Sequence, residues 1–476
     1  MTKLALINPI VSSFGEKDEQ HDPPLGLAYL ASYLRRYLNF DNTVIIDKEK
    51  NLLEAIKREK PDIVGITSMS LEYNKIANMG TEIKETFDIP VLIGGVHISL
   101  MPHHLSNFDV GVINEGEQTI LELMKIYLKQ GCFPLDKLRG VEGIVFNDNG
   151  NIRINNKRTL INPLDSIPFP ARDLLNMKNY MIPRRNFFSK IGRYAQMITS
   201  RGCPYKCSFC SSSKFWQSYR RFSAEYVVSE IELLIEKYKA EGIIIWDDLF
   251  IADIDRLEKI SEILKERKID IKFNIWSRAN LINKHVCELL KKIGVEATVF
   301  GLESGSEKIL QKLKGKSVTV KDNKRALKLC KEAGITTIGN LVMGHPEETE
   351  EDLRKTLSLV RNPNLDCFLV FQLTPLPKTE IWKYAKSIGL VSDSVNFDYS
   401  QLSITGYKPE LIMTKNLDRD KFYKWYLFFK EEANKKNIPL KVNTIRIKDV
   451  FNFLRYGGIR RIKKNWKIYL KQLKIK

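Results

Sequence analysis

The sequence predicts an α/β protein in which a doubly wound (Rossmann-like) parallel sheet comes first, an open (β/α)6 barrel follows, and a helical tail ends the chain. Three observations support this fold class. Strand-like and helix-like segments alternate up to about residue 130, the alternation lapses between about 135 and 195, and a second alternating series then begins. Strands that alternate with helices form parallel sheets, because each crossover helix returns the chain to the same end of the sheet. The length of 476 residues suits two or three such domains.

The first alternating series defines a predicted domain over residues 1–134. Helices are expected from Pro24 through Leu34, over Ile76–Phe87 and over Thr119–Leu128. Strands are expected at Leu4–Ile7, Val44–Ile46, Ile63–Ile66, Val91–Ile93 and Val110–Ile113. Ligands of doubly wound sheets bind beyond the carboxyl ends of the strands. The loops at 67–70, 94–95 and 114–117 follow three of these ends and are therefore the candidate binding loops.

The lapse in the pattern predicts a linker over residues 135–194. Val141–Phe146 and Ile152–Ile154 flank Asn149-Gly150, a pair that favours the tight turn of a β-hairpin. Prolines then follow at positions 163, 168 and 170. We interpret this segment as a linker that contains a hairpin and packs across two domains.

The second alternating series predicts a barrel domain over residues 195–410. Its strands are expected at Met197–Thr199, Ile243–Trp246, Ile271–Trp276, Ala297–Phe300, Thr336–Met343 and Phe368–Leu373. Its helices are expected to start near Ser223, Ile254, Asn283, Gly305 and Glu350, with one more over Lys321–Ala333 that Gly334 closes. As in closed barrels, the chemistry should gather at the carboxyl ends of the strands.

The composition describes a folded protein with an excess of basic residues. The chain is 43% hydrophobic and 28% charged, which excludes a disordered protein. The first residues become polar too soon for a signal peptide, and no later run is long enough to span a bilayer, so we expect a cytoplasmic location. The net charge of +19 indicates an acidic partner such as a nucleic acid, an anionic membrane or a phosphorylated substrate.

Much of this charge lies in a predicted basic helical extension over residues 411–476. Residues 441–476 contain 12 Lys or Arg against the single Asp449. One apolar stripe at helical spacing is formed by Ile459, Ile462, Trp466, Tyr469, Leu470 and Leu473. Such a helix can lie on an anionic membrane, bind nucleic acid electrostatically, or pack its stripe on the barrel. Of the two binding alternatives we favour the membrane, because no RNA-binding module accompanies the helix.

Three of the seven cysteines are grouped as metal ligands are. Cys203, Cys207 and Cys210 have the spacing C-x3-C-x2-C and follow the first barrel strand. Three thiolates on one loop can hold three corners of a 4Fe-4S cluster and leave the fourth iron open. A zinc knuckle needs four closed ligands, and no fourth Cys or His lies nearby. The remaining four cysteines, which we expect to be small buried residues, are Cys132, Cys287, Cys330 and Cys367.

The cysteine motif resembles that of the radical-SAM superfamily, in which an aromatic residue, here Phe209, precedes the last cysteine. Further similarity lies in segments 246–250, 301–306 and 344–349, each at or after a predicted strand end. The resemblance implies that the open iron binds S-adenosylmethionine, which the cluster cleaves reductively. It further implies that Glu303 and Ser304 contact the methionine part or ribose, Arg278 the carboxylate and Phe209 the adenine. Other interpretations of the sequence remain open, since Glu303 could cap the next helix and Asp247 or Asp248 could be a turn acid. The family's more usual glycine after the last strand's proline is Lys378 here.

The N-terminal domain resembles the cobalamin-binding domain found ahead of radical-SAM barrels, through Pro23–Leu27 and the three candidate loops. The residues that this resemblance assigns to cobalamin are Thr67, Ser68, Gly94, Gly95, Glu115 and Gly116. Glu49 stands where the family's Asp-x-His-x-x-Gly motif would supply a lower-axial His. No His at that position can therefore ligate cobalt, and we expect His97 to be a loop or core histidine.

These resemblances predict an enzyme that functionalises an unactivated carbon with a radical derived from S-adenosylmethionine. With cobalamin, the favoured reaction is methyl transfer to a lipid or another apolar metabolite; ring formation and rearrangement remain open. The expected partners are an electron donor such as flavodoxin or ferredoxin, the substrate, and a membrane surface contacted by the tail. The alternatives are a tRNA-modifying enzyme, whose relatives have three N-terminal cysteines where this chain has only Cys132, and a non-catalytic iron-sulphur redox sensor. The sequence names no catalytic side chain.

Overall fold

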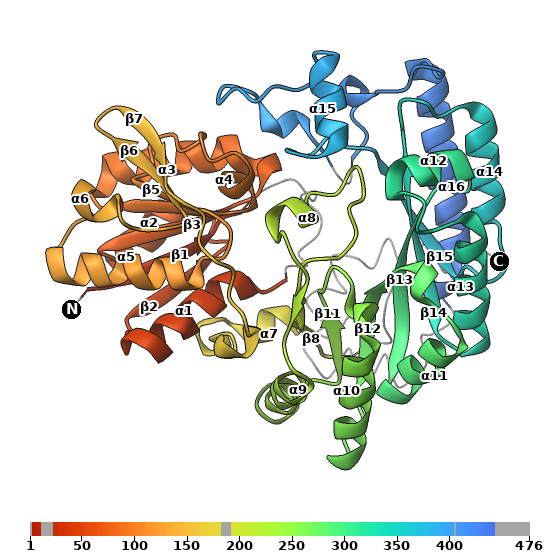
Figure 1. The fold of residues 1–476 in the computed structure, drawn as a ribbon, viewed down its shortest axis with the longest axis horizontal. Helices are drawn as coiled ribbons and strands as arrows, with labels where there is room; N and C mark the ends of the chain where they lie inside the picture. The colour runs from red at the N-terminus through yellow and green to blue at the C-terminus, as the bar shows by residue number, and fades with distance from the viewer. Residues whose placement is uncertain (1, 11–21, 182–191, 404–405, 443–476) are drawn as a thin grey trace, which may run out of the picture.

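The computed structural model describes residues 2–10, 22–181, 192–403 and 406–442, with side chains up to residue 437. Two α/β units lie side by side in Figure 1. The N-terminal unit is drawn in red to orange on the left, and the barrel unit in green to blue on the right. No helix within these ranges is both long enough and apolar enough to cross a membrane.

The N-terminal unit is built on a seven-stranded sheet with the strand order β2-β1-β3-β4-β5-β6-β7. The strands are β1 Leu4–Asn8, β2 Thr43–Asp47, β3 Ile63–Ser68, β4 Val91–Gly95, β5 Val110–Val112, β6 Ile144–Asp148 and β7 Asn151–Ile154. The first five pair in parallel, as the alternating sequence predicts. The doubly wound fold predicted for this part of the chain is therefore confirmed.

The hairpin β6/β7 is present at the predicted place but belongs to this sheet. The linker predicted over residues 135–194 includes this hairpin, whereas β6 in fact pairs antiparallel with β5 and covers its free edge. Val145 and Phe146 are fully buried there. Asn149 and Gly150 have positive φ angles of 55° and 90°, as the tight turn requires. The connection between the two sheets is therefore the shorter segment between β7 and the first barrel strand.

Helices cover both faces of the N-terminal sheet (Figure 1). They are α1 Leu25–Leu38, α2 Leu52–Glu59, α3 Tyr73–Phe87, α4 Val96–Leu100, α5 Glu117–Gln130 and α6 Leu135–Leu138, with α7 Met177–Tyr180 in the connection. In α5, Ile120, Leu123 and Met124 share one buried face. Gly131 ends this helix at a φ of 70°, in the left-handed region that glycine adopts readily.

The barrel unit is a six-stranded parallel sheet with the order β15-β14-β13-β12-β11-β8. Its strands are β8 Tyr194–Met197, β11 Gly242–Ile245, β12 Lys272–Ser277, β13 Val295–Glu303, β14 Thr336–Met343 and β15 Cys367–Gln372. A separate short ribbon is formed by β9 Ser200–Arg201 and β10 Arg220–Arg221. Since β8 and β15 are the two edges of the sheet, the barrel is open, and the prediction of six strands is confirmed.

Six helices of the barrel unit start within two residues of the predicted positions. The helices of this unit are α8 Ser212–Phe215, α9 Ala224–Tyr238, α10 Ile254–Glu266, α11 Lys284–Ile293, α12 Glu307–Lys314, α13 Val320–Glu332, α14 Glu350–Val360 and α15 Glu380–Ser387. Ser223 accepts a hydrogen bond from the backbone N–H of Tyr226, which caps α9. Asn283 caps α11 in the same way, and Gly334 follows α13 at a φ of 69°.

Short 3₁₀ turns complete the two units. They are η2 Ser70–Glu72, η3 Leu164–Ser166, η4 Arg172–Leu174, η5 Phe250–Ala252, η6 Ala279–Leu281, η7 Tyr399–Gln401 and η8 Pro409–Leu411. Of these, η2 follows β3 at the carboxyl edge of the N-terminal sheet, and η4 lies in the connection between the units.

The last helix of the described residues, α16 Arg419–Val442, covers the free edge of β15. Phe422 and Phe429 are fully buried in the barrel core. The Asn437 amide accepts from the backbone N–H of Phe368 (3.2 Å) and donates to its carbonyl (3.1 Å), so it replaces a neighbouring strand there. The first part of the extension 411–476 therefore packs on the barrel. The basic stripe over 459–473 lies outside the described residues.

A segment after the barrel, residues 378–402, returns to the N-terminal unit, and we call it the clasp. It includes α15, which Figure 1 shows at the top between the two units. Tyr399 is fully buried, stacks on Trp382 and packs edge-on against Tyr73 and His97 of the N-terminal unit. The Asn74 side chain bonds to the backbone on both sides of Asp398. The clasp thus fixes the two units with an aromatic core.

The clasp also encloses two histidines of the N-terminal unit. His97 Nδ1 lies 3.1 Å from Ser70 Oγ, His97 Nε2 lies 3.1 Å from His104 Nδ1, and His104 Nε2 lies 3.0 Å from the carbonyl oxygen of Asp393. The carbonyl of Asp393 can only accept, so His104 donates to it from Nε2. The Nδ1 atom of the neutral His104 ring then accepts from Nε2 of His97. The Nδ1 atom of His97 in turn accepts from the hydroxyl of Ser70. Burial lowers the pKa of His97 to about 3. His97 is therefore a neutral core histidine.

We expect Tyr399→Ala to lower the free energy of unfolding by about 3–5 kcal/mol, because a fully buried aromatic ring leaves a cavity. The control Tyr423→Ala removes a ring of α16 that is 42% exposed and should cost about 0.5 kcal/mol or less. Chemical denaturation of the two variants measures both changes. Equal, small losses would show that the clasp does not hold the two units together.

Candidate functional site

The three cysteines of the motif lie on a loop that is closed at its base. This cluster loop, residues 202–219, leaves β9 and returns into β10, and the two short strands pair antiparallel. Gly202 has a φ of 84°, and a Cβ at this position would lie 2.4 Å from the carbonyl oxygen of Ser218. Only glycine therefore lets the two ends of the loop meet.

A buried carboxylate fixes the base of the cluster loop to the barrel. Asp247, which follows β11, accepts from the backbone N–H groups of Thr199 (2.6 Å) and Ser200 (3.1 Å) and from both their hydroxyls. This arrangement supports the interpretation of Asp247 as a turn acid. Farther along the loop, the N–H of Ser208 donates to the carbonyl of Leu313 and its carbonyl accepts from the N–H of Ile381. The loop is thus held by β11, α12 and α15 together.

The three thiols are partly buried and lie close enough to affect one another. Burial raises the pKa of Cys210 to about 12, and it also raises the pKa of Cys203. The neighbouring Asp248 carboxylate and the Cys207 thiol add to both shifts. Thiolates in this position need positive charge beside them, which iron supplies. The donor set therefore suits a bound metal cluster.

Within the described ranges, no three His, Cys, Asp or Glu side chains converge on one point as the ligands of a single metal ion would. A 4Fe-4S cluster, by contrast, takes each thiolate at a separate iron. Of the other four cysteines, Cys287, Cys330 and Cys367 are buried as expected. The expectation is wrong for Cys132, which is exposed because it lies just beyond the end of α5.

Arg278 lies directly against the cluster loop. Its Nη1 lies 3.4 Å from the sulphur of Cys207, and its guanidinium carbon lies 3.8 Å from the centre of the Tyr205 ring. Its Nη2 donates to Ser317 Oγ and to the carbonyl of Lys314. Arg278 therefore places a fixed positive charge at the cysteine motif, and its predicted contact with a cofactor carboxylate remains a prediction.

Glu303 ends β13 in a conformation that is rare for a residue with a side chain. Its φ is 58°, and the pairing with β14 shifts by one residue there. Its Oε1 lies 3.7 Å from Nζ of Lys314, which also donates to the carbonyl of Gly301 at 2.5 Å. Burial raises the pKa of Glu303 and lowers the pKa of Lys314. The structure thus brings a buried ion pair to the site beside Arg278.

Sequence reasoning missed Lys314, because a lysine in the last turn of an amphipathic helix is usually solvated. The only available signal was that α12 follows the strand end that carries Glu303. Phe209 is partly buried against the hydrophobic core that also contains Leu313 and Ile381. Ser304 is fully buried, with its hydroxyl bonded to Thr356 and to the N–H of Ser306. These bonds give Ser304 a structural role, and the cofactor contacts of Phe209 and Ser304 stay predictions.

The barrel interior is apolar at its floor and aromatic above it. The floor is a small buried cluster formed by Ala297, Val299, Ile338 and Cys367, against which Trp276 packs. Trp246 stacks on Trp276 with ring centres 4.5 Å apart, and it remains 41% exposed. Asn340 lies opposite Gly301 on the next strand, and its buried Oδ1 has no hydrogen-bond partner. The interior therefore offers an aromatic face and a free acceptor to a ligand.

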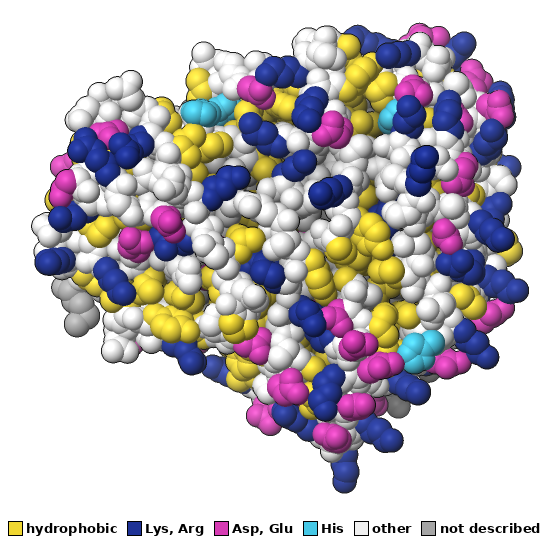
Figure 2. Space-filling view, viewed as in Figure 1, with side chains coloured by type: hydrophobic (Ala, Val, Ile, Leu, Met, Phe, Trp, Pro, Cys, Tyr) yellow, Lys and Arg dark blue, Asp and Glu magenta, His cyan; other side chains and the backbone are white. Residues whose placement is uncertain are grey.

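Hydrophobic side chains also reach the surface of the barrel unit. Figure 2 shows them gathered right of the centre of this face. Lys and Arg side chains are spread over both units there and are interspersed with Asp and Glu. The described surface on this side thus carries its basic charge as a scattered pattern, without one continuous basic stripe.

Four of the residues predicted to bind cobalamin lie together at the carboxyl edge of the N-terminal sheet. Thr67 is paired with Gly94 and Ser68 with Gly95 on the adjacent strands β3 and β4. Gly95 has a φ of 99°, and a Cβ there would lie 2.5 Å from the carbonyl oxygen of Ser68. A Cβ on Gly94 would meet nothing closer than 4.0 Å, so this glycine leaves an open backbone face.

The other two predicted residues, Glu115 and Gly116, follow β5 at the same edge. Gly116 packs against Leu30, since a Cβ on it would lie 3.1 Å from that side chain. The Glu115 carboxylate is directed toward the other unit, where it binds Arg201 and Arg220 beside the cluster loop. Its contact with cobalamin stays a prediction, while its contact with the cluster loop is observed.

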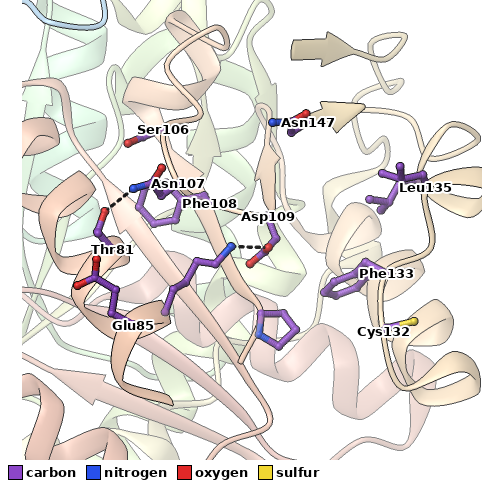
Figure 3. A pocket seen from close by; sticks show the side chains of 13 residues that line it. Thr81, Glu85, Ser106, Asn107, Phe108, Asp109, Cys132, Phe133, Leu135 and Asn147 are labelled. Carbon is purple, nitrogen blue, oxygen red and sulfur yellow. Dashed lines mark hydrogen bonds and ion pairs between the residues drawn. The ribbon is translucent and has the colours of Figure 1, made fainter. Parts of the chain in front are cut away.

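A large pocket of the N-terminal unit lies at the opposite edge of the sheet. It has a volume of about 690 Å³ and is lined by residues of α3, α6 and the segment before β5. Figure 3 shows Thr81 and Asn107 joined across its wall, with Asp109 and Phe133 nearby. Asp109 precedes β5, so this pocket lies at the amino ends of the parallel strands. Ligands of such sheets bind at the carboxyl ends, and we therefore do not place the site here.

Comparison with known proteins agrees with this geometry. The family model "Radical SAM superfamily" matches residues 197–360, and the model "B12 binding domain" matches residues 16–124. An uncharacterized methyltransferase of Pyrococcus horikoshii is 33% identical over 398 residues, which are 81% of this chain and 83% of the relative. An anaerobic magnesium-protoporphyrin IX monomethyl ester cyclase of Rubrivivax gelatinosus is 30% identical, over 80% of this chain and 69% of the relative.

Among solved structures, the cobalamin-dependent S-adenosylmethionine radical enzyme OxsB, with aqua-cobalamin and S-adenosylmethionine bound, has a similar fold. The TM-score is 0.71 at 19% sequence identity, and the match covers 99% of this chain and 80% of that one. At this identity the similarity describes the fold alone. Both units, in the same order along the chain, are thus shared with that enzyme.

We expect Cys207→Ala to abolish cluster assembly, because the two remaining thiols cannot hold the cluster by themselves. The control Cys132→Ala changes an exposed cysteine outside the motif and should leave the iron content unchanged. Iron and sulphide analysis after anaerobic reconstitution measures both. Full iron content in Cys207→Ala would contradict the assignment of the motif.

The pKa of Glu348 gives a test of the segment 344–349. Its buried carboxyl group accepts from the N–H of Gly344 at the end of β14, and burial raises its pKa to about 8. Since this pKa is higher in the folded state than in the unfolded state, its contribution to stability is present at low pH and is lost as the pH rises toward 8.

Between pH 5.5 and 7.5, the stability of the wild type relative to Glu348→Gln should therefore fall by on the order of 1 kcal/mol per pH unit. Glu347→Gln is the control, since Glu347 is exposed and paired with Lys312. Denaturation curves across this range measure the trend. A wild-type stability that runs parallel to that of Glu348→Gln would show that Glu348 titrates normally.

Proposed function

Because the chain belongs to the radical SAM superfamily and carries a B12 binding domain ahead of the radical SAM domain, we propose that it is a methyltransferase that modifies an unactivated carbon of an apolar substrate. Its cofactors are a 4Fe-4S cluster, S-adenosylmethionine and cobalamin. When bound, the cluster supplies the electron that cleaves S-adenosylmethionine, and cobalamin carries the methyl group to the substrate.

The residues of the barrel unit fit these groups. Cys203, Cys207 and Cys210 would hold the cluster. Burial raises the pKa of Cys203 and of Cys210, so their thiolates need the adjacent positive charge that a cluster supplies. Arg278, Lys314 and Glu303 offer two positive charges and one negative charge beside the loop, which suits the carboxylate and amino groups of an amino-acid cofactor. The free Oδ1 of Asn340 adds a buried acceptor in the barrel interior.

The residues of the N-terminal unit fit a large planar cofactor. Gly94 leaves the end of β4 open on one face, so the backbone can approach a ligand closely there, while Gly95 allows the close contact with Ser68 of β3. Thr67 and Ser68 flank these glycines on β3. The described residues 47–49 contain no histidine at the carboxyl end of β2, so cobalt would receive no lower ligand from this position.

One observation carries the proposal: the cluster loop lies directly against the carboxyl edge of the N-terminal sheet. Arg201, two residues before Cys203, bonds to both Glu115 and Glu117 at the end of β5 and the start of α5. Methylation of an unactivated carbon would require both cofactor sites to reach the same carbon of the substrate. An iron-sulphur sensor has no need of this arrangement, so the geometry favours a catalyst.

The barrel interior supports an apolar substrate. The apolar floor and the exposed face of Trp246 offer dispersion and stacking contacts but few charged groups that could recognise a phosphate backbone. The similar cyclase of Rubrivivax gelatinosus acts, by its name, on a porphyrin ester. We therefore favour a lipid or a planar apolar metabolite over tRNA.

Enzymes of this superfamily need an electron donor, and we propose a cytoplasmic flavodoxin or ferredoxin in this role. A small acidic donor would be attracted by the excess of basic residues, which totals +19 for the chain. Contact of the tail with a membrane surface also stays a proposal, because the basic stripe lies outside the described residues.

The proposed function predicts two products from the reduced, reconstituted protein. Incubated with trideuteromethyl S-adenosylmethionine, cobalamin and an extract of lipids and small metabolites from cells that lack the protein, it should release 5'-deoxyadenosine and S-adenosylhomocysteine. It should also add one labelled methyl group to an extract component, detected by mass spectrometry. Labelled tRNA nucleosides from a parallel tRNA incubation would favour the alternative function. If neither 5'-deoxyadenosine nor S-adenosylhomocysteine formed, the proposal that the protein is an enzyme would be contradicted.

We expect Trp246→Ala to lower kcat/KM for this component by about 3- to 10-fold, because an aromatic contact is worth about 0.5–1.5 kcal/mol. Formation of 5'-deoxyadenosine without substrate should change little, since Trp246 is 41% exposed and holds no cysteine of the motif in place. An unchanged kcat/KM would place the substrate elsewhere.

A further inference from the structure

The two units are joined beside the cluster loop by four charged residues, which we call the interdomain latch: Glu115, Glu117, Arg201 and Arg220. Arg201 Nη1 lies 2.5 Å from Glu115 Oε1, and Arg201 Nη2 bonds to Glu117 Oε1. Arg220 Nη1 lies 2.8 Å from Glu115 Oε2. One guanidinium group thus binds two carboxylates of the N-terminal unit, and a second guanidinium binds one of them again.

The latch is buried, so its geometry is strongly constrained. Arg201 is 5% exposed, Glu115 8% and Glu117 4%. Burial alone would lower the pKa of Arg201, but the carboxylates of Glu117 and Glu115 more than offset this and raise it. Burial would likewise raise the pKa of Glu115, and the two guanidinium groups lower it instead. Arg201 and Glu115 are therefore held in their charged forms, and each depends on its partners remaining in place.

Both strands at the base of the cluster loop take part in the latch. Arg201 belongs to β9 and Arg220 to β10, and these residues are paired across the ribbon. The ring of Trp216, near the end of the loop, lies 5.4 Å from the Arg201 guanidinium, and the ring of Tyr29 of α1 lies 5.8 Å from it. The loop cannot shift relative to the N-terminal unit without moving the Arg201 guanidinium away from its two carboxylates and these two rings.

The other end of the latch is joined to the predicted cobalamin loops. Glu117 is the first residue of α5, and Glu115 follows β5, which pairs with β4 through Leu92 and Ile93. Gly94 and Gly95 come next along β4. Glu115 also accepts from the N–H of Ile161, whose carbonyl accepts from Arg220. The carboxyl edge of the sheet and the base of the cluster loop thus form one connected polar network.

We propose that the interdomain latch couples the two cofactor sites, with Arg201 and Glu117 as positioning residues that touch neither cofactor and Glu115 as the carboxylate that joins them to the predicted cobalamin loops. The cluster orders the loop, the ordered loop places Arg201 and Arg220 against the two glutamates, and the carboxyl edge of the N-terminal sheet is thereby preorganised for cobalamin. Energetic coupling is reciprocal, so bound cobalamin stabilises the cluster loop by the same free energy. This inference rests on the proposed function, because it requires both cofactors.

Equilibrium binding of hydroxocobalamin to the full-length protein tests the latch. The dissociation constant is measured by equilibrium dialysis for the cluster-loaded protein and again after the iron has been removed with a chelator. We expect the wild-type chain to bind about tenfold more tightly with its cluster, within the range of about 5- to 150-fold that is typical of coupled sites. A dissociation constant that is equal in the two forms would overturn the latch and leave the proposed function standing.

Glu117→Gln removes one charge without changing shape, and Arg201→Lys keeps the charge but cannot bind two carboxylates with one planar group. In both variants the ratio of the two dissociation constants should fall to about 2 or less, well below the usual range for coupled sites. The cluster-free proteins should bind hydroxocobalamin as the cluster-free wild type does. Weaker binding by cluster-free Glu117→Gln would make Glu117 a direct cofactor contact and overturn its role as a positioning residue.

Glu230→Gln is the matched control for a loss of stability. Glu230 of α9 forms an equally buried ion pair with Arg172 in the connection between the units, and neither residue belongs to the cluster loop or the latch. This variant should keep the wild-type ratio, whereas a purely structural effect would lower the ratio in all three variants. Failure of the wild type to bind hydroxocobalamin in either form would contradict the proposed function itself and the latch with it.

Discussion

The arrangement of the two units depends on one buried guanidinium group placed between two carboxylates. Moving Arg201 out of water is costly, and only two partners at hydrogen-bond distance offset that cost. Glu115, Glu117 and Arg201 come from elements that must all be correctly folded before they can meet. The ion pairs therefore fix the relative positions of β5, α5 and β9. The cluster loop follows β9, so its position is fixed as well.

Two further contacts between the units support the same arrangement by different physics. The clasp buries Tyr399 among aromatic rings and histidines, which is a non-directional hydrophobic contact. In the connection between the units, the buried pair of Arg172 and Glu230 fixes η4 to α9. The aromatic contact supplies stability. The ionic contacts fix the relative orientation of the elements that they join, because a guanidinium group binds a carboxylate in only a few orientations.

The sequence predicts what depends on local periodicity and on spacing. Six barrel strands, five N-terminal strands and the caps at Ser223 and Asn283 follow from patterns within about ten residues of each other. The pairing of the hairpin with β5 was not predictable in this way, because it depends on which sheet edge remains free. The partners of Glu115 were missed for the same reason, since Arg201 is 86 residues away in the chain.

The site brings together buried ionisable groups, and the charged form of each would be unfavourable without an opposite charge nearby. Glu303 and Lys314 lie 3.7 Å apart, and burial shifts the pKa of each toward its neutral form. A ligand that brings one carboxylate and one amino group offers each of them an opposite charge, so it can replace this loose pair without leaving a charge unpaired. Lys314 could not be recognised from sequence, because its function as a buried charge arises only when α12 packs its last turn against the end of β13. The local sequence is thus enough to predict the cysteine motif and its chemistry. The charged groups that surround the motif are brought together only by the tertiary fold.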